Sequence, residues 1–349
     1  MIESLLDIIK AEGASDLHLS VGRRPCIRVN GELTQLMNQQ VLDQTSVLTM
    51  LVELVGDARA RQVLEHTELD FSYDYTPAGM RFRGSAYIQT GHVAVALRSI
   101  DKIKTLAELG LPEVLADFAR REQGFFLVVG PVGQGKSTTL AAMIDLINTE
   151  RKEHIVTIEN PIEYIFEEKN SIIEQREVGI DTHSFQSGLE SSFRQDVNVI
   201  MIGEMRNPET VSTAVTAAET GHLVISTLHT NSASQTIDRI IDLFDGYEET
   251  QIRNQLSSSL IGIFSQRLVT SLKGGRVPAY ELLINNPAVS NLIREGRTHE
   301  IDSVIETSAG EGMVTMNHSL LELIRQGHIT LDDAMRHSLN PEGLKRLVS

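Results

Sequence analysis

The chain lacks tryptophan and has only one cysteine among its 349 residues. Because it stands alone, Cys26 can form neither an intramolecular disulfide nor a zinc site built from several cysteines. The neighbouring Ile27 and Val29 are apolar, so we expect Cys26 to be an ordinary strand residue. The sequence also has no apolar run of the roughly 18 residues that span a membrane, and its first residues lack a signal-peptide pattern. These absences predict a cytoplasmic protein.

Basic residues are scarce relative to acidic ones. The chain has 31 Lys and Arg against 47 Asp and Glu, which gives a net charge of −16. A surface of this charge repels polyanions, so we expect no nucleic-acid partner. The length exceeds one ordinary hydrophobic core and predicts about two domains, which 41% hydrophobic residues are sufficient to fill.

The first hundred residues predict a small α+β domain. A helix is expected over residues 2–10, and Asn30-Gly31 is a strong hairpin turn because both positions tolerate positive φ. The expected strands are residues 17–21, 27–29, 69–75, 80–89 and 93–100. We therefore predict an N-terminal domain over residues 1–100, a linker over 101–111 and a second domain over 112–349.

The second domain is predicted to be an α/β domain in which helices cover a parallel sheet, because strands and helices alternate from residue 125. A helix from Pro112 to near Gly124 should precede the first strand. The expected strands are residues 125–129, 155–158, 199–202 and 223–228. After residue 230 the chain is predicted to be mostly helical, with helices over 232–243 and 248–264 and a hairpin near 273–276.

Residues 130–137 form a complete phosphate-binding loop, Gly-Pro-Val-Gly-Gln-Gly-Lys-Ser, between a predicted strand and a predicted helix. In such loops backbone N–H groups point at phosphate oxygens, the lysine reaches the β- and γ-phosphates, and the serine binds magnesium. The bare pattern arises by chance in roughly one random chain of this length in a hundred. The residues predicted to bind ATP are Gly130, Pro131, Val132, Gly133, Gln134, Gly135, Lys136, Ser137 and Thr138.

Polar residues follow the other predicted strands, and ligands of open α/β sheets bind at the carboxyl ends of strands. Glu159, Glu204 and His229 should therefore converge with the loop on one nucleotide. Glu204 is predicted to activate the attacking water, with a surface acid as the alternative. Glu163 lies four residues after Glu159, but Pro161 between them indicates a loop, whose acids contact magnesium or water or are simply solvated.

Two histidines flank the predicted strand at residues 223–228. Seven steps of about 3.3 Å put His222 and His229 more than roughly 20 Å apart, so they cannot share a metal. His229, at the carboxyl end, can reach a γ-phosphate or be structural. His222, at the amino end, could equally be a structural polar residue.

These residues together resemble the type IV pilus retraction ATPases of the secretion-ATPase superfamily, and the resemblance covers nearly the whole chain. The matching motifs are residues 15–18, 130–137, 157–164, 175–179, 202–206, 220–222, 229–231 and 252–257. The resemblance implies a PAS-like N-terminal domain and a RecA-like ATPase domain, assembled as a ring of six subunits. It also implies ATP and Mg²⁺ as cofactors, pilus disassembly as the task, and a place at the inner face of the cytoplasmic membrane.

The resemblance assigns roles to individual residues and partners. It implies that Lys136 and Ser137 hold phosphate and magnesium, that Glu204 and Glu163 serve hydrolysis, with Glu163 near the metal, and that His229 senses the γ-phosphate. Arg81 and Arg83 would complete the nucleotide site, and an arginine supplied in trans can raise the rate about 10³- to 10⁵-fold. The alternative for both arginines is an outward charge on a strand. The implied partners are an inner-membrane platform protein and a paralogous retraction ATPase.

The segment at residues 251–257 matches a family motif that is needed for retraction. Its apolar positions Ile252, Leu256, Leu260 and Ile263 recur at helical spacing and predict a buried stripe. Arg253, Asn254 and Ser257 would then face a groove or a partner, or be an ordinary solvated face.

Two asparagines depart from the family pattern, because Asn160 and Asn198 stand where aspartates are usual. We therefore expect two carboxylates to be missing near the site and hydrolysis to be slower than the family norm. One alternative function is a pilus-assembly or type II secretion ATPase, although such relatives typically carry a four-cysteine zinc insertion. Another is a weakly active nucleotide-binding subunit that works beside an active paralogue.

Overall fold

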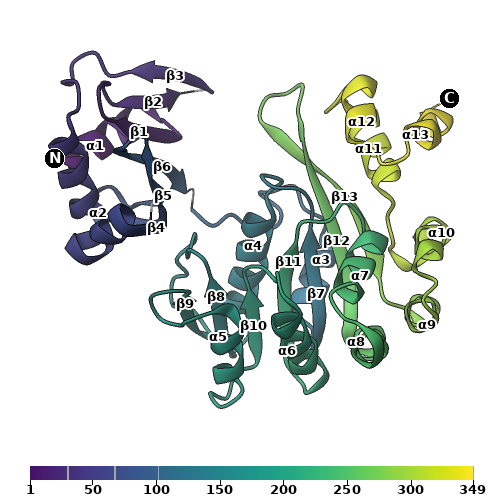
Figure 1. Ribbon diagram of the computed structural model, residues 1–349. Coiled ribbons are helices and arrows are strands. Elements are labelled where there is room, and N and C mark those ends of the chain that lie inside the picture. The colour runs from purple at the N-terminus through teal and green to yellow at the C-terminus, as the bar shows by residue number, and fades with distance from the viewer. Residues whose placement is uncertain (30, 67, 101, 349) are drawn as a thin grey trace. The chain divides into compact units, whose positions relative to one another are not determined.

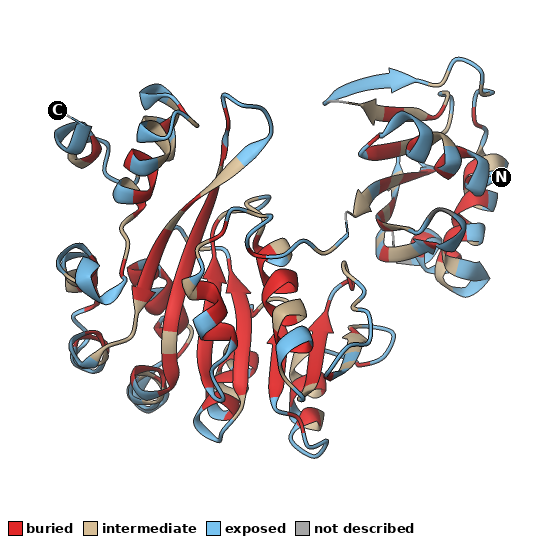
Figure 2. Ribbon diagram, turned by 180° about the vertical axis from the view of Figure 1, so that it is seen from behind, coloured by how far each residue is buried: buried red, intermediate tan, exposed pale blue. Residues whose placement is uncertain are grey.

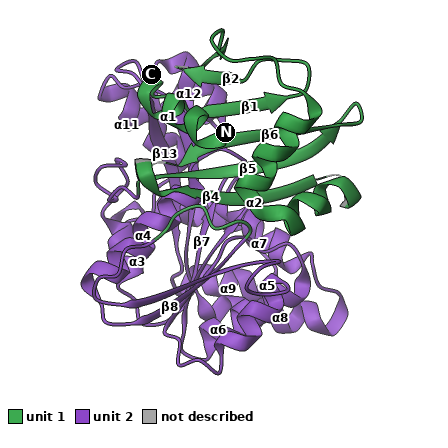
Figure 3. Ribbon diagram, turned by 90° about the vertical axis from the view of Figure 1, so that its left-hand side faces the viewer, with its two compact units in different colours: residues 1–102, 160–165 green, residues 103–159, 166–349 purple. Residues whose placement is uncertain are grey.

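The computed structural model describes residues 1–29, 31–66, 68–100 and 102–348. The chain divides into two compact units (Figure 3). Unit 1 comprises Met1–Lys102 and Asn160–Ile165, and unit 2 comprises Ile103–Glu159 and Phe166–Ser349. The domain limits at residues 100 and 111 stay a prediction, and nothing in the sequence pattern indicated that Asn160–Ile165 belongs to unit 1.

Unit 1 is an antiparallel sheet of six strands in the order β3-β2-β1-β6-β5-β4 (Figure 1). The strands are β1 (Asp16–Ser20), β2 (Cys26–Val29), β3 (Glu32–Gln35), β4 (Glu68–Tyr75), β5 (Met80–Gln89) and β6 (His92–Ile100). Two helices, α1 (Ile2–Glu12) and α2 (Gln44–His66), accompany them. Apolar residues of α1 such as Leu5 and Ile9 share one core with Leu17 and Leu19, which lie two apart on β1 and therefore face the same side.

The predicted α+β class of this unit is confirmed. The first helix, the strand that contains Cys26 and the three long strands are present close to their predicted bounds. The predicted hairpin joins β2 to β3, with Gly31 at φ 87°, while Asn30 lies outside the described residues. Helix α2 and strand β3 were not predicted.

Unit 2 contains a sheet of seven strands in the order β13-β12-β7-β11-β10-β8-β9, in which only the β12–β13 pair is antiparallel. The strands are β7 (Gly124–Val129), β8 (His154–Glu159), β9 (Ile172–Glu177), β10 (Val199–Ile202), β11 (Leu223–Leu228), β12 (Leu260–Thr270) and β13 (Arg276–Ile284). The helices that pack on this sheet are α3 (Val114–Ala119), α4 (Lys136–Glu150), α5 (Phe185–Ser192), α6 (Pro208–Glu219), α7 (Ala233–Ile241) and α8 (Gly246–Ser259). The C-terminal helices are α9 (Pro287–Glu295), α10 (Ile301–Thr307), α11 (Met316–Arg325), α12 (Leu331–His337) and α13 (Pro341–Val348).

Helices cover both faces of this sheet, so its central strands are buried throughout (Figure 2). Helices α3 and α4 pack on one face, where Phe126 and Val128 of β7 meet Met143 of α4. Helices α5 to α8 pack on the other face, where Leu127 of β7 meets Ile237 of α7. Among the described residues no helix has the length and apolarity needed to cross a bilayer.

The predicted strands of unit 2 are present, but three further strands were missed. The helix predicted over 248–264 is wrong at its end, because α8 stops at Ser259. Leu260 and Ile263 lie on β12 instead, since a short apolar run fits a fully buried strand as well as a helix. The predicted helix from Pro112 to near Gly124 is wrong at its end, since α3 stops at Ala119. The hairpin expected near residues 273–276 is confirmed as the turn between β12 and β13.

Helix α8 corrects one further expectation. Ser257 is buried and donates a hydrogen bond to the Asn254 carbonyl at 2.7 Å, so it does not face a partner. Arg253 is partly buried, with an ion pair to Glu249 at 2.7 Å and a hydrogen bond to the Ile293 carbonyl at 3.3 Å. Asn254 is exposed, so it is the residue of the three that this helix presents to solvent.

Candidate nucleotide-binding site

The phosphate-binding loop leaves β7 at the centre of the sheet and ends where α4 begins, at Lys136. Gly135 caps this helix with φ 83°, a left-handed conformation that glycine adopts without steric cost. Gly130 lies so close to β12 that an added Cβ would meet the Gln266 carbonyl oxygen at 2.5 Å. The glycines that the sequence motif requires are therefore also required by the backbone path and its packing.

Lys136 is buried, with 7% of its surface exposed, and its ammonium group has three acceptors. Its Nζ donates to the carbonyl oxygens of Gly130 at 2.7 Å and Pro131 at 2.9 Å, and to His229 Nδ1 at 3.1 Å. Burial lowers the pKa of Lys136 to about 8; the carboxylate of Glu204 opposes this shift and the charge of Arg267 adds to it. The three N–H donors of the Lys136 ammonium thus point at neutral acceptors. The oxygens of an anionic phosphate can replace these acceptors.

Glu204 and His229 follow neighbouring parallel strands, β10 and β11, and lie close together. Glu204 Oε2 is 3.8 Å from His229 Nε2, and Glu204 Oε1 is 2.8 Å from the guanidinium of Arg206. Burial, followed by the charge of Lys136, lowers the pKa of His229 and favours the neutral ring. Because an ammonium can only donate, Nδ1 is the acceptor, and the neutral imidazole carries its proton on Nε2.

The expected convergence at the carboxyl ends of the strands is therefore seen for Lys136, Glu204 and His229. Glu159 ends the next strand, β8, and is buried; its carboxylate accepts from Thr157 Oγ1 at 2.8 Å and Gln175 Nε2 at 3.3 Å. His222 lies at the opposite end of β11, where its Nδ1 is 3.0 Å from the Ala217 carbonyl. The ring of His222 is thus held by a backbone carbonyl at the end of β11 that is opposite Glu204 and His229.

The predicted site residues Arg81, Arg83 and Glu163 lie in unit 1. Arg83 of β5 forms an ion pair with Glu163 at 2.6 Å, and Arg81 pairs with Asp74 at 2.6 Å. Arg81 Nη2 also donates to the Ile162 carbonyl at 2.8 Å. The structure thus groups Glu163 with the two arginines, whereas Lys136, Glu204 and His229 are grouped in unit 2. Exposed ion pairs of this kind contribute about 0–1 kcal/mol, so the Arg83–Glu163 pair can exchange partners at little cost.

The position of Asn198 overturns one expectation from the sequence. Asn198 lies at the amino end of β10, where its Oδ1 accepts from His154 N at 2.9 Å and its N donates to the His154 carbonyl at 2.9 Å. The four residues of β10 separate it from the end that carries Glu204, by roughly 13 Å at about 3.3 Å per residue. An asparagine in place of an aspartate at this position therefore takes no carboxylate away from the site. The hydrogen bonds of Asn198 instead join the amino ends of β8 and β10.

The side chains at the phosphate-binding loop suit a magnesium ion that is coordinated mainly by phosphate oxygens and water. Ser137 is exposed on the first turn of α4, where its hydroxyl is accessible. The described residues contain no group of three or more His, Cys, Asp or Glu side chains that could hold a metal ion. Magnesium in nucleotide sites typically takes one or two protein ligands and completes its shell with phosphate oxygens and water, and Ser137 can supply such a ligand.

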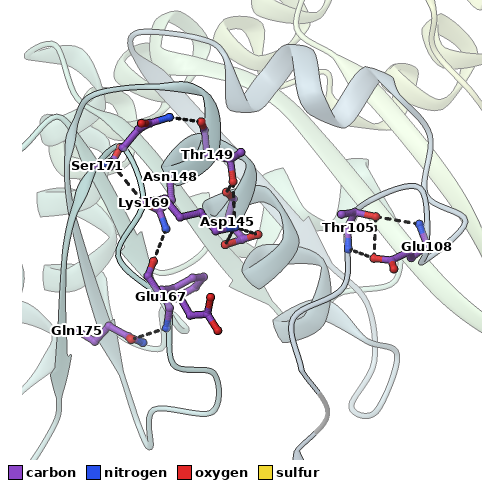
Figure 4. Close-up of polar contacts among 11 residues, drawn as sticks. Thr105, Glu108, Asp145, Asn148, Thr149, Glu167, Lys169, Ser171 and Gln175 are labelled. Carbon is purple, nitrogen blue, oxygen red and sulfur yellow. Dashed lines mark hydrogen bonds and ion pairs between the residues drawn. The ribbon is translucent and has the colours of Figure 1, made fainter.

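Helix α4 is also fixed at its far end, by contacts that the sequence did not predict (Figure 4). Lys169 forms an ion pair with Asp145 at 2.8 Å and donates to Thr149 Oγ1 at 3.0 Å. Asn148 donates to the Glu167 carbonyl at 2.8 Å. The chain that leads from Glu163 back to β9 is therefore anchored on the helix that begins with Lys136.

A glycine-rich loop between a buried strand and a helix, with an acid and a histidine on neighbouring strand ends, defines this protein as a P-loop nucleotide-binding protein. Residues 1–336 match the family model described as "Type II/IV secretion system protein". The chain is 42% identical over 342 residues to the type IV pilus retraction ATPase PilT of Pseudomonas aeruginosa, covering 98% of this chain and 99% of that protein. It is 39% identical over 348 residues to the type IV pilus ATPase PilU of the same organism, covering 99% and 91%.

A solved structure agrees with these sequence relationships. The crystal structure of the pilus retraction motor PilT with bound ADP matches with a TM-score of 0.92 at 44% identity, covering 99% of both chains. The chain therefore belongs to the type II/IV secretion system protein family and, within it, to the type IV pilus retraction ATPases, as its motifs predicted.

Proposed function

We propose that this protein hydrolyses ATP to power the retraction of a type IV pilus. The observation that carries the proposal is that Lys136 Nζ lies 3.1 Å from His229 Nδ1 and Glu204 Oε2 lies 3.8 Å from His229 Nε2, in a chain that matches a pilus retraction motor over 99% of its length. The arrangement supplies a cation for phosphate, a carboxylate for water and a neutral donor between them. These are the parts that phosphoryl transfer to water requires.

Each residue has a defined task in this proposal. Lys136 binds the β- and γ-phosphates, and Ser137 binds magnesium, which neutralises phosphate charge when present. Glu204 orients and deprotonates the attacking water. The Nε2–H of neutral His229 donates to the γ-phosphate, so its loop distinguishes ATP from ADP.

The remaining predicted residues act through assembly. Arg81 and Arg83 belong to an N-terminal domain over residues 1–100, and they complete the nucleotide site of a neighbouring subunit in a ring of six. Glu163, on the segment Asn160–Ile165, serves hydrolysis near the metal. The ring works at the cytoplasmic face of the inner membrane, on a platform protein of the pilus machinery, alone or beside a paralogous retraction ATPase. The similarity to both PilT and PilU supports this part of the proposal.

Deletion of the gene tests the direction of the motor. We expect cells without the protein to carry more pili than the parent and to lose twitching, because pili are extended but not withdrawn. The parent gene should restore twitching, Glu204→Gln at equal expression should not, and Glu209→Gln should restore it. Glu209 is an exposed acid in the first turn of α6, so it is a matched control for the same chemical change.

Two outcomes would contradict the proposal. Bald cells after deletion would indicate pilus assembly. Purified protein that binds ATP without hydrolysing it, at concentrations where rings form, would indicate a nucleotide-binding subunit of another ATPase.

A further inference from the structure

Two adjacent buried residues of β12, Gln266 and Arg267, have no role in the site described so far. Their exposed fractions are 3% and 6%. Successive side chains of a strand point to opposite faces of its sheet. The packing agrees, since Phe264 shares a core with α4 and Ile263 shares a core with α7. Gln266 therefore faces the helix that follows the phosphate loop, and Arg267 faces the helix that follows His229.

Gln266 holds the phosphate-binding loop. Its Oε1 accepts from Thr139 Oγ1 at 2.7 Å, and its Nε2 donates to the Gln134 carbonyl at 2.8 Å. The side chain of Gln134 in turn accepts from Leu268 N at 2.6 Å. The oxygen and the nitrogen of the buried Gln266 amide thus both have partners, in the first turn of α4 and in the loop. These bonds fix the position of the loop, because each lost bond would leave a buried polar group unpaired.

Arg267 holds the loop that begins with His229. Its Nη2 donates to the Asn231 carbonyl at 3.1 Å and to Asn231 Oδ1 at 3.0 Å, and its Nη1 donates to the Gln266 carbonyl at 3.2 Å. Ser265 Oγ also donates to the Asn231 carbonyl, at 3.0 Å. Asn231 is exposed and lies two residues after His229, so these bonds tie the turn between β11 and α7 to β12.

The charge of Arg267 is only partly balanced within the same hairpin, because burial raises the pKa of the Glu281 carboxyl to about 7. Glu281 of β13 is buried diagonally across from Arg267, and its carboxylate accepts from Ala233 N at 2.8 Å, at the start of α7. The positive charge of Arg267 is also felt at Lys136, where it helps to lower the pKa of that ammonium. The hairpin therefore reaches both loops through hydrogen bonds and charge.

We propose that Gln266 and Arg267 are positioning residues that fix the phosphate-binding loop and the His229 loop relative to each other. The inference rests on the proposed ATPase function. Neither residue touches nucleotide in this account; Gln266 sets the loop that binds the diphosphate, and Arg267 sets the distance of His229 from the γ-phosphate. The two should therefore differ in which kinetic constant they control.

The test for Arg267 is Arg267→Lys, which keeps the positive charge but cannot form the three-bond fork to Asn231 and Gln266. We expect kcat for ATP to fall about tenfold or more, because small displacements of reacting groups have large rate effects. The dissociation constant for ADP should change less than threefold, since ADP has no γ-phosphate. Arg239→Lys is the matched control, because Arg239 is exposed on α7.

The test for Gln266 is Gln266→Met, which keeps the volume and removes both hydrogen bonds. We expect the dissociation constant for ADP to rise about tenfold, together with KM for ATP, because the loop is no longer fixed before binding. If Arg267→Lys fails to fold, Asn231→Ala removes one acceptor of the same fork from an exposed position. Where both fold, their effects on kcat should be less than additive, as expected of two residues that act through one contact.

Hydrogen exchange gives a readout that does not need turnover. Backbone amides of residues 229–235 should exchange faster in Arg267→Lys than in the parent, and at the parent rate in Arg239→Lys. Parent-like kcat and exchange in a folded Arg267→Lys protein, or parent-like ADP affinity in Gln266→Met, would overturn the inference. If the parent itself hydrolyses no ATP, the proposed function fails, while exchange and ADP binding still decide this inference.

Discussion

Lys136 Nζ lies 3.1 Å from His229 Nδ1, so the predicted phosphate cation and the predicted γ-phosphate sensor contact each other directly. Each N–H of the ammonium can serve one acceptor at a time, and phosphate oxygens compete for these donors. Nucleotide binding at Lys136 alters the hydrogen bonding of His229 when a phosphate oxygen takes the donor that His229 now accepts. The site can pass information from the phosphate loop to the next strand without any movement of the sheet.

The affinity for ADP should depend on pH through Lys136. Burial lowers the pKa of this ammonium to about 8, and only the charged form attracts phosphate. Affinity should be nearly constant below pH 8 and should fall by up to about tenfold per pH unit above it, with proton uptake on binding. Calorimetry at pH 7 and pH 9 measures both quantities. Lys136→Arg is the control, because a guanidinium stays charged throughout this range, and constant affinity of the parent to pH 9.5 would contradict the prediction.

Lys136→Ala and Glu204→Gln should separate binding from hydrolysis. Lys136→Ala deletes the phosphate cation, so both nucleotide affinity and turnover should be lost. Glu204→Gln keeps the size of the side chain and removes the base, so ATP should bind and remain unhydrolysed, with kcat lower by about 10² or more. Nucleotide binding and phosphate release are measured separately. Hydrolysis at the parent rate by Glu204→Gln would show that another group activates the water.

Gly130→Ala should destabilise unit 2 even without nucleotide. The new Cβ would lie 2.5 Å from the Gln266 carbonyl, and Gly130 has φ 147°, which other residues rarely adopt. We expect the free energy of unfolding to fall by about 2 kcal/mol in urea titrations. Gly310→Ala is the control, because that glycine has no atom within 4 Å of its added Cβ and no positive φ. Equal stability of the two variants would mean that the loop relaxes freely away from β12.

If Arg81 and Arg83 complete the site of a neighbouring subunit, two inactive proteins should rescue each other. Arg81→Ala with Arg83→Ala retains a good phosphate loop, and Lys136→Ala retains good arginines. Some interfaces in mixed rings pair an intact phosphate loop with intact arginines, so mixing should restore part of the turnover. The activity of the parent protein per subunit should also rise with its concentration as rings form. The absence of recovery in rings shown by mass measurement to be mixed would rule out completion in trans.

Helix α8 should couple hydrolysis to retraction through Asn254, an exposed polar residue of its motif. Asn254→Ala, alone and with Arg253→Ala, should keep most ATPase activity and fail to restore twitching to a deletion strain. The double variant should also be less stable, because Arg253 bonds to Glu249 and to the Ile293 carbonyl. Exposed Ser258→Ala on the same helix is the control. Full twitching by Asn254→Ala at normal expression would indicate an ordinary solvated face.

Local chemistry explains what could be predicted from the sequence. The phosphate-binding loop needs its glycines, lysine and serine in one continuous segment, and β7, β10 and β11 are buried apolar runs, so both features are visible without a fold. Strand β12 was assigned in part to a helix because Leu256, Leu260 and Ile263 satisfy a helical spacing, while two of them lie on a buried strand. Short apolar runs do not distinguish these states.

Contacts between distant segments could not be predicted. Arg83 and Glu163 are 80 residues apart, and no local pattern indicates that the segment Asn160–Ile165 packs on unit 1. Gln266 and Arg267 carry no motif of their own, and their importance is visible only through Gln134 and Asn231. The expectation for Asn198 was wrong for another reason: Asn198 precedes the predicted strand 199–202, and the amino end of a parallel strand lies opposite the carboxyl end where ligands bind, so its position could have been predicted.

The placement of Asn160–Ile165 in unit 1 affects how this protein can be dissected. The chain passes between the units three times, after Lys102, after Glu159 and after Ile165. A fragment that begins at Ile103 would carry the segment Asn160–Ile165 without Arg81, Arg83 and Ser72, the side chains that bind it. Such a fragment would thus contain an untethered segment, and low activity in it would say nothing about the intact enzyme.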